Sequence, residues 1–365
     1  FSIGYSHSEP PIQENQVGLY EPWQAIGDNW RPGVPAGTYY SDGAKALRRT
    51  GRTERDGVIA TLQFRPSNAW TSTLDMFHTT AKQVDTANQF EVHIGDYNGG
   101  YGRLEVTNPV INGDNTFIGG TANNVYPLIR GMYNKREDEI NAFGWNNEFN
   151  VGQAKIVADV SWSKAERDEI NLENNTQLLP APQLDSVDLD FATGGFSQLN
   201  PGRDYSDPNS LYLTGTIYGS GYGKTPSVVD ELTSFKLAAS LPSPLGWFSD
   251  IDVGLNYADR EKNKRQPEGN INLGAQGATT IASDLQYRPV DLGFAGIGMI
   301  PSWNVPGAVD RYMIFEPSGD AFPYLVAKAW DVFEKTTTAF VKGNIDTEWG
   351  GIPARGNVGL QLQST

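Results

Sequence analysis

The sequence contains no cysteine, which excludes disulfide scaffolds, thiolate metal sites and cysteine nucleophiles. A chain without cysteine fits the cytosol, and it also fits export through an oxidising periplasm, where stray thiols are a hazard. Nowhere do 18 consecutive apolar residues occur, so the sequence predicts no transmembrane helix. A protein that crosses a membrane with β-strands is not excluded, because barrel strands carry a much weaker hydropathy signal.

Basic residues are also few. The chain has 28 Lys and Arg against 43 Asp and Glu, a net charge of −15. Because nucleic-acid binders need cations to neutralise phosphates, we expect no nucleic-acid partner. Glycine (40), Tyr (16), Phe (16) and Trp (9) are plentiful instead, which argues against a disordered chain and against a helical bundle. The 365 residues do not fix a domain count, because barrels routinely exceed the usual domain size.

Apolar and polar residues alternate, as in a β-strand, in four pairs of segments. Short turns at 66–68, 150–154, 242–249 and 349–353 separate the members of each pair. With an opening strand at 1–6, the pattern predicts about nine strands of roughly 9–14 residues, enough to cross a bilayer when tilted. One predicted face carries apolar residues: Val58, Leu62, Val160, Trp162, Val253, Leu255, Val341 and Leu360. The opposite face carries Asp75, Glu148, Asp159, Lys236, Asp252, Lys342 and Asp346.

Long segments separate the pairs, at 8–52, 82–139, 166–230 and 262–332. Short turns on one side and long segments on the other are typical of an outer-membrane barrel, with periplasmic turns and extracellular loops. Aromatic residues lie at the turns (Trp70, Phe149, Trp247, Trp349) and near the far strand ends (Trp162, Tyr257), as in two interfacial girdles. A soluble β-sandwich or lectin, whose strands also alternate, is the alternative.

An odd number of strands cannot be a complete single-chain barrel, because such barrels have an even number. The chain also begins and ends inside alternating runs. We therefore expect an all-β, antiparallel, curved sheet with both outer strands unpaired, a fragment of a transmembrane barrel.

Motifs for chemistry are weak. Residues 219–225 resemble a phosphate-binding P-loop but have Tyr218 where the motif needs glycine. His7, His78 and His93 are scattered, and Asp185, Asp188 and Asp190 could ligate Ca²⁺ but lack the rest of an EF-hand. The mixed charges at 134–139 and 164–169 predict a salt-bridged rim. No nucleophile with its base is apparent, so we expect no enzyme, no catalytic residue, no cofactor and no metal.

Several blocks are similar to TonB-dependent receptors, particularly the long-loop type of Xanthomonas- and Caulobacter-like bacteria. The similarity runs over essentially the whole chain and is most specific in its strand-turn-strand blocks. These blocks are GRTERDGVIATLQFRP (51–66), YNKREDE (133–139), FGWNNEF (143–149), ADVSWSKAERD (158–168) and WGGIPARGNVG (349–359).

The resemblance implies a 22-stranded barrel in the outer membrane of a Gram-negative bacterium, filled by an N-terminal plug. A TonB box ahead of the plug is pulled by the TonB complex, driven by proton-motive force, to admit a scarce nutrient. Residues 1–365 would then be part of the barrel domain, without plug, TonB box or terminal strands, in contact with outer-membrane lipid. The TonB complex would be a partner through that missing N-terminal region.

The ligand is expected to be a carbohydrate. Aromatic residues stand among Asn, Asp and Gly in the long segments, and we take Trp23, Trp30, Tyr101 and Trp303 as ligand contacts. Aromatic faces stack on sugar rings and amides bind hydroxyls, which suits a neutral oligosaccharide. A net charge of −15 is a poor host for anionic ferric complexes. The alternatives are a siderophore or cobalamin receptor, a passive porin and a soluble glycan-binding β protein.

Overall fold

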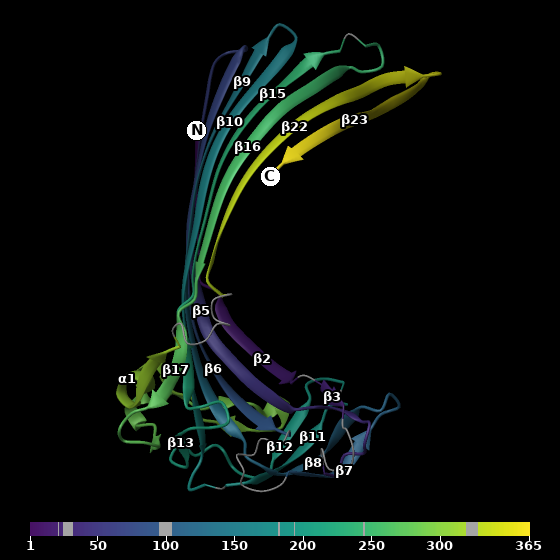
Figure 1. Cartoon of the computed structure of the whole chain (residues 1–365). Helices are drawn as coiled ribbons and strands as arrows, with labels where there is room; N and C mark the ends of the chain where they lie inside the picture. Colours follow the sequence, from purple (N-terminus) through teal and green to yellow (C-terminus); the bar gives the residue numbers. More distant parts are fainter. Residues whose placement is uncertain are drawn as a thin grey trace.

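The computed structural model of the chain describes residues 1–20, 22–24, 32–94, 104–181, 183–192, 194–243, 245–318 and 328–365, with only the backbone of 22–24 and of Trp349. One antiparallel sheet dominates this part of the chain (Figure 1). In spatial order its long path is β1 (Ser2–Ser8), β5 (Gly43–Ser67), β6 (Trp70–His93), β9 (Leu128–Val151), β10 (Ala154–Leu178), β15 (Ser227–Pro242), β16 (Asp250–Arg265), β22 (Trp330–Trp349) and β23 (Ile352–Ser364).

The sheet curves strongly and stays open in the described residues (Figure 1). Among the strands that the structure describes, β1 pairs only with β5 and β23 only with β22, so both lie at edges. Each predicted turn joins two neighbouring strands, β5 to β6, β9 to β10, β15 to β16, and β22 to β23. The predictions of an all-β antiparallel fold, of about nine long strands and of unpaired outer strands are confirmed within the described chain.

Strand length was underestimated. β5 and β10 have 25 residues and β6 and β9 have 24, well beyond the expected 9–14. The apolar alternation stops after about nine residues because charged side chains then occupy both faces, as at Lys135 to Glu139. Backbone hydrogen bonds between the strands continue past this point. The alternation of apolar and polar side chains therefore ends before the strand does.

The register places like side chains on the same face across the sheet. Leu74 pairs with Leu62 and Trp145, and Leu255 pairs with Leu237 and Ala339. Because partners in a ladder share a face, these residues define one side, which we call the apolar face. The eight predicted apolar residues from Val58 to Leu360 all lie on it. The other side, the polar face, carries Asp159, Lys236 and Asn256 in one row.

The remaining elements gather at the end of the sheet away from the short turns (Figure 1). A second sheet has the order β12 (Gln198–Pro201), β11 (Asp185–Asp190), β8 (Phe117–Val125) and β7 (Glu105–Ile111). The other elements are β2 (Pro11–Leu19), β3 (Pro22–Gln24), β4 (Tyr39–Ser41), β13 (Leu211–Leu213), β14 (Gly221–Lys224), β17 (Glu268–Leu273), β18 (Thr279–Thr280), η1 (Ser283–Leu285), β19 (Val290–Asp291), η2 (Gly293–Ala295), β20 (Met299–Ile300), α1 (Val305–Tyr312) and β21 (Met313–Pro317).

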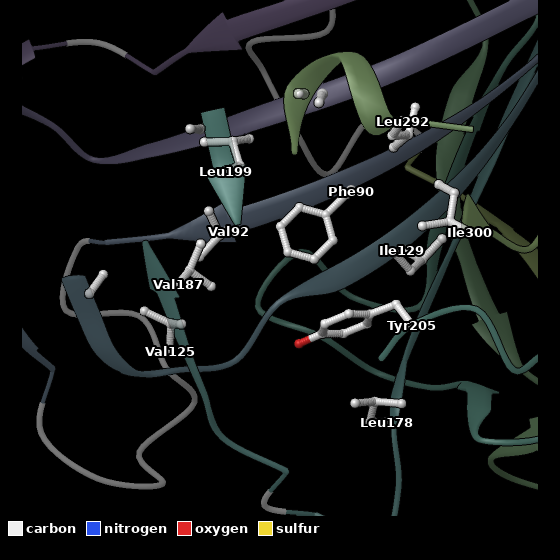
Figure 2. Close-up of a cluster of buried hydrophobic side chains, with 14 of the residues drawn as sticks. Phe90, Val92, Val125, Ile129, Leu178, Val187, Leu199, Tyr205, Leu292 and Ile300 are labelled. Carbon is white, nitrogen blue, oxygen red and sulfur yellow. The ribbon is translucent and has the colours of Figure 1, made fainter. Parts of the chain in front are cut away.

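These elements bury the apolar face at this end of the sheet. Phe90 and Val92 of β6 and Ile129 of β9 point into a cluster with Leu292 and Ile300 (Figure 2). Tyr205 packs edge-on against Phe90, with 5.2 Å between the ring centroids. The long segments are therefore folded layers of the molecule, and the hydrophobic core lies between them and the sheet.

Trp303 packs this core against the sheet at Gly131. Asn88, Gly131 and Asn174 form one row on the apolar face, and the indole of Trp303 occupies the space that a side chain at Gly131 would need. The indole Nε1–H donates to Asn174 Oδ1 over 2.9 Å, and the side chain is 1% exposed.

We expect Gly131→Ala to destabilise the fold by about 1–3 kcal/mol, because the new methyl group would lie 2.5 Å from the Trp303 ring. Gly144→Ala on the same strand is the control, since its methyl group would meet nothing nearer than 3.9 Å. The free energy of unfolding in urea is the measurement. Equal losses for the two variants would contradict the role given to Trp303.

Candidate ligand site on the polar face

The apolar face is exposed at the short-turn end of the sheet. Phe143, Trp145 and Val151 of β9 are open to the surroundings, as are Leu255 (45% exposed) and Leu360 (76%). On β9 this exposed apolar band runs about nine residues, or roughly 30 Å along the strand. That length matches what a tilted strand needs to cross the hydrocarbon core of a bilayer.

Aromatic side chains border this band at both ends. At the short turns, the rings of Trp70 and Phe149 stack with 6.2 Å between centroids. At the opposite border, Trp162 Nε1–H donates to Glu231 Oε1 over 2.7 Å and the Tyr257 hydroxyl to Asp259 Oδ2 over 3.3 Å. Trp162 and Tyr257 thus belong to the apolar face while their polar tips bind charged residues, the arrangement favoured where apolar surface meets water.

The predicted charged rim is present beyond the band. Lys135 lies 3.2 Å from Glu137, Lys164 lies 2.8 Å from Glu166, and Arg167 lies 2.6 Å from Asp138. These pairs join neighbouring strands or alternate positions of one strand. The rim is a set of exposed or half-exposed ion pairs, which contribute little stability individually.

A groove crosses the polar face at the height of this rim. One row of paired residues, Arg55, Ala81, Asp138, Arg167, Val228, Lys264 and Trp330, runs across it from β5 to β22. Side chains of both charges line it, and Asp230 binds Arg260 and Lys262 at 2.6 and 3.2 Å. The polar face therefore offers water and polar solutes a continuous lining.

About ten residues further along β6 lies a buried polar cluster built around Glu91. Register brings Lys45 opposite Glu91, and Arg130 opposite both Gln89 and Asn175. Glu91 is 0% exposed, and all its acceptor capacity is used. Its Oε1 accepts from the Tyr20 hydroxyl and lies 3.1 Å from His93 Nε2, while Oε2 accepts from Gln89 over 2.6 Å and lies 3.4 Å from Arg130.

Arg130 connects this carboxylate to a second one. Its Nε donates to Asn175 Oδ1 over 3.1 Å, and its Nη1 lies 3.5 Å from Glu173 Oε2. The guanidinium also lies 5.1 Å from the ring centroid of Tyr218, within cation–π range. Arg130 is thus held in one orientation by three kinds of contact.

Electrostatics keep Glu91 ionised and the tyrosines neutral. Burial alone would raise the pKa of Glu91, but the hydrogen bond from His93, the charge of Arg130 and the Tyr20 hydroxyl outweigh it and lower that pKa to about 2. Burial, with the charge of Glu91, raises the pKa of Tyr218 to about 12 and that of Tyr20 as well. Both hydroxyls therefore stay protonated at neutral pH, and that of Tyr20 donates to Glu91.

Three rings surround the cluster. The ring centroids of Tyr20 and His93 are 5.0 Å apart and those of His93 and Tyr218 are 4.9 Å apart. The Tyr218 hydroxyl binds His93 Nε2, and the Lys45 ammonium lies 4.9 Å from the Tyr20 ring centroid. Aromatic faces, a carboxylate and hydroxyl groups thus converge within one cluster of the polar face, a combination suited to a polar organic ligand.

The predicted ligand contacts are only partly visible. Trp23 lies in β3, where only the backbone is described, while Trp30 and Tyr101 lie outside the described residues. Trp303 is buried in the core under Asn174 with no ring face open to a ligand. A role for these four in ligand contact stays a prediction.

The cluster itself was not predicted, except that Tyr20 was among the aromatic residues of the long segments. A signal existed at Gln89, Glu91 and His93, three polar residues that alternate on one face while Phe90 and Val92 face the other. The alternation read from the sequence instead places 82–139 in a long segment between strands and assigns His93 no role.

The other weak motifs find structural roles. Residues 221–224 form β14, which pairs with β10 and β17. Asp185 binds Tyr205, whereas Asp188 binds Thr121 and Asp190 caps Ala192, so the three aspartates do not converge. Among the described residues no group of His, Asp and Glu is arranged to hold a metal ion, and no helix there is long and apolar enough to cross a bilayer.

Comparisons with protein-family models, with curated proteins and with solved structures found no match. The resemblance to TonB-dependent receptors thus remains an expectation from the sequence.

We expect Glu91→Gln to cost about 3–5 kcal/mol of folding free energy at neutral pH, because it leaves Arg130 without its buried partner charge. The folded-state pKa of about 2 lies below the ordinary 4.5, so the stabilisation by ionised Glu91 is complete above pH 4.5 and is lost as pH falls through about 2. The difference between wild type and variant should shrink over that window.

Glu148→Gln serves as the control, since Glu148 pairs with Lys155 at the surface over 2.9 Å and its loss should cost less than about 1 kcal/mol. Urea unfolding at several pH values measures both variants. Similar losses for the two, or a Glu91→Gln loss that does not change with pH, would argue against a structural role for the Glu91 charge.

Proposed function

We propose that the chain is part of an outer-membrane receptor that takes up a nutrient, a saccharide in our view, across the bilayer of a Gram-negative bacterium. The observation that carries this is the exposed apolar band, of bilayer-strand length and bordered by aromatic residues, on one face of a sheet whose other face is polar. Alternation of this kind is what a barrel strand needs, with lipid outside and a wet lumen inside.

A soluble sandwich accounts for the band less well. Such a fold covers the apolar face of each sheet with another sheet. Within the described residues the face is covered only at the loop end, by the core around Phe90 and Trp303, while Leu237, Leu255 and Leu360 stay open. A soluble monomer rarely exposes an apolar surface that extends over so many strands.

The unpaired edges at β1 and β23 fit the same proposal, because a spanning sheet must close so that no edge faces lipid. Further strands would complete a 22-stranded barrel, with the short turns in the periplasm and the long segments outside the cell. A plug with a TonB box would couple uptake to the TonB complex. A passive porin would share the sheet and lack these parts.

The substrate class rests on the Glu91 cluster. Glu91 and Glu173 offset Arg130 and Lys45, so the cluster has no excess charge to attract an anionic ferric complex, although the chain as a whole is acidic. Aromatic rings and hydroxyl groups suit an uncharged, hydroxyl-rich ligand. Siderophore or cobalamin uptake is the second candidate.

We expect Leu255→Arg to destabilise the bilayer-embedded chain by about 2–4 kcal/mol, because it places a charge at a mid-band position that would face lipid. Asn256→Arg is the matched control, since Asn256 neighbours Lys236 and Thr338 on the polar face and its replacement stays in water. Folding into lipid vesicles, followed by gel mobility and protease protection, measures both.

Two results would count against the proposal. One is equal folding of the two arginine variants in vesicles. The other is recovery of the expressed chain in the soluble fraction as a folded monomer, which would favour the soluble glycan-binding protein.

A further inference from the structure

The tip between β13 and β14 brings Tyr218 over the Glu91 cluster. A tight turn forms because Thr216 N and Gly219 O, and Gly219 N and Thr216 O, exchange hydrogen bonds of 3.1 and 2.9 Å, with Gly219 at a φ of +74°. The Thr216 hydroxyl also accepts from Tyr218 N over 3.1 Å. A residue with a Cβ is strained at such a φ, so glycine fixes the direction of the tip.

Tyr218 is contacted by its neighbours and is also partly exposed. Arg130 lies over its face at 5.1 Å and its hydroxyl binds His93, yet the residue is 42% exposed. These contacts therefore set the orientation of the ring, while part of the residue stays exposed. A ring that is held rigidly and remains accessible makes a stacking platform at little entropic cost.

Glu173 supplies an acceptor beside this platform. Its side chain is 26% exposed, and within the described part of the chain its polar contact is the 3.5 Å approach of Arg130 Nη1 to Oε2. Burial and the nearby Glu91 charge raise the pKa of Glu173, while Arg130 opposes them. A carboxyl group with spare acceptor capacity binds the hydroxyls of a sugar, and a site built to bind hydroxyls rejects ligands without them.

We propose that the exposed face of Tyr218 and the carboxyl group of Glu173, arranged around Arg130, form a binding subsite for one ring of a neutral oligosaccharide. This inference rests on the proposed uptake function and assigns to it residues on β10 and on the β13–β14 tip. The C–H face of the sugar stacks on Tyr218 and neighbouring hydroxyls bind Glu173. Glu91 organises the subsite through Arg130 and His93 without touching the ligand.

The test is titration calorimetry on the 365-residue chain folded in detergent micelles, with maltotetraose, cellotetraose and xylotetraose as neutral probes. At least one probe should bind, and Tyr218→Ala should weaken it by about tenfold or more. Tyr218→Phe keeps the ring and should retain most of the affinity. Glu173→Gln should weaken binding, and Tyr287→Ala, which alters an exposed tyrosine outside the cluster, should not.

Three outcomes overturn the subsite: no probe binds at millimolar concentration, Tyr218→Ala binds as tightly as the wild type, or tetragalacturonate binds more tightly than every neutral probe. The last result would move the ligand to the cations Arg55 and Lys264, which line the groove. Failure of the membrane proposal is seen separately, by fractionation. If the chain is embedded in the membrane but binds no probe, only the proposed subsite is contradicted. If the chain is soluble and binds a probe, only the proposed membrane role is contradicted.

Discussion

The continuous antiparallel register of the main sheet determines the rest of the structure. Because paired residues share a face, the ladder from β5 to β23 sorts every side chain onto one of two surfaces over the full sheet. The apolar face then has two different environments. At the loop end the chain buries it with its own core around Phe90, Ile129 and Trp303, and at the short-turn end the chain leaves it open.

That contrast within one face supports the membrane role proposed above. Burial of apolar surface is the main favourable term in folding. At the loop end of the sheet the chain buries the apolar face under its own core. An uncovered band next to a covered one implies that something else covers it. The aromatic borders agree, since Trp162 and Tyr257 place their rings on the band and their polar tips on Glu231 and Asp259.

The Glu91 cluster follows from the same register on the opposite face. Alternation along β6 sends Phe90 and Val92 into the core and therefore sends Gln89, Glu91 and His93 to the polar face. A buried carboxylate there is tolerable only with full hydrogen bonding and a partner charge, which Tyr20, Gln89 and Arg130 provide. Residues from β5, β6, β9, β10 and the β13–β14 tip thus converge on one point, and their contacts hold Tyr218 in place.

Sequence patterns predicted the sheet well and the site poorly. Alternation at positions such as Leu255 and Asn256 identified strands, faces and turns, because a half-exposed strand has a period of two. It failed beyond the band, where Lys135 to Glu139 are charged on both faces and nothing in the side chains marks the strand. The cluster was missed because Tyr20, Glu91, Arg130 and Tyr218 are far apart in the chain and only the register of long strands brings them together.

If the two faces of the sheet meet different solvents, the absence of cysteine makes this directly measurable. Single cysteines at neighbouring positions of β15 and β16, Leu237→Cys and Leu255→Cys on one face and Lys236→Cys and Asn256→Cys on the other, can be labelled in vesicles with a water-soluble maleimide. We expect rapid labelling of the polar-face pair and protection of the apolar-face pair by lipid. Equal labelling at all four positions would contradict it.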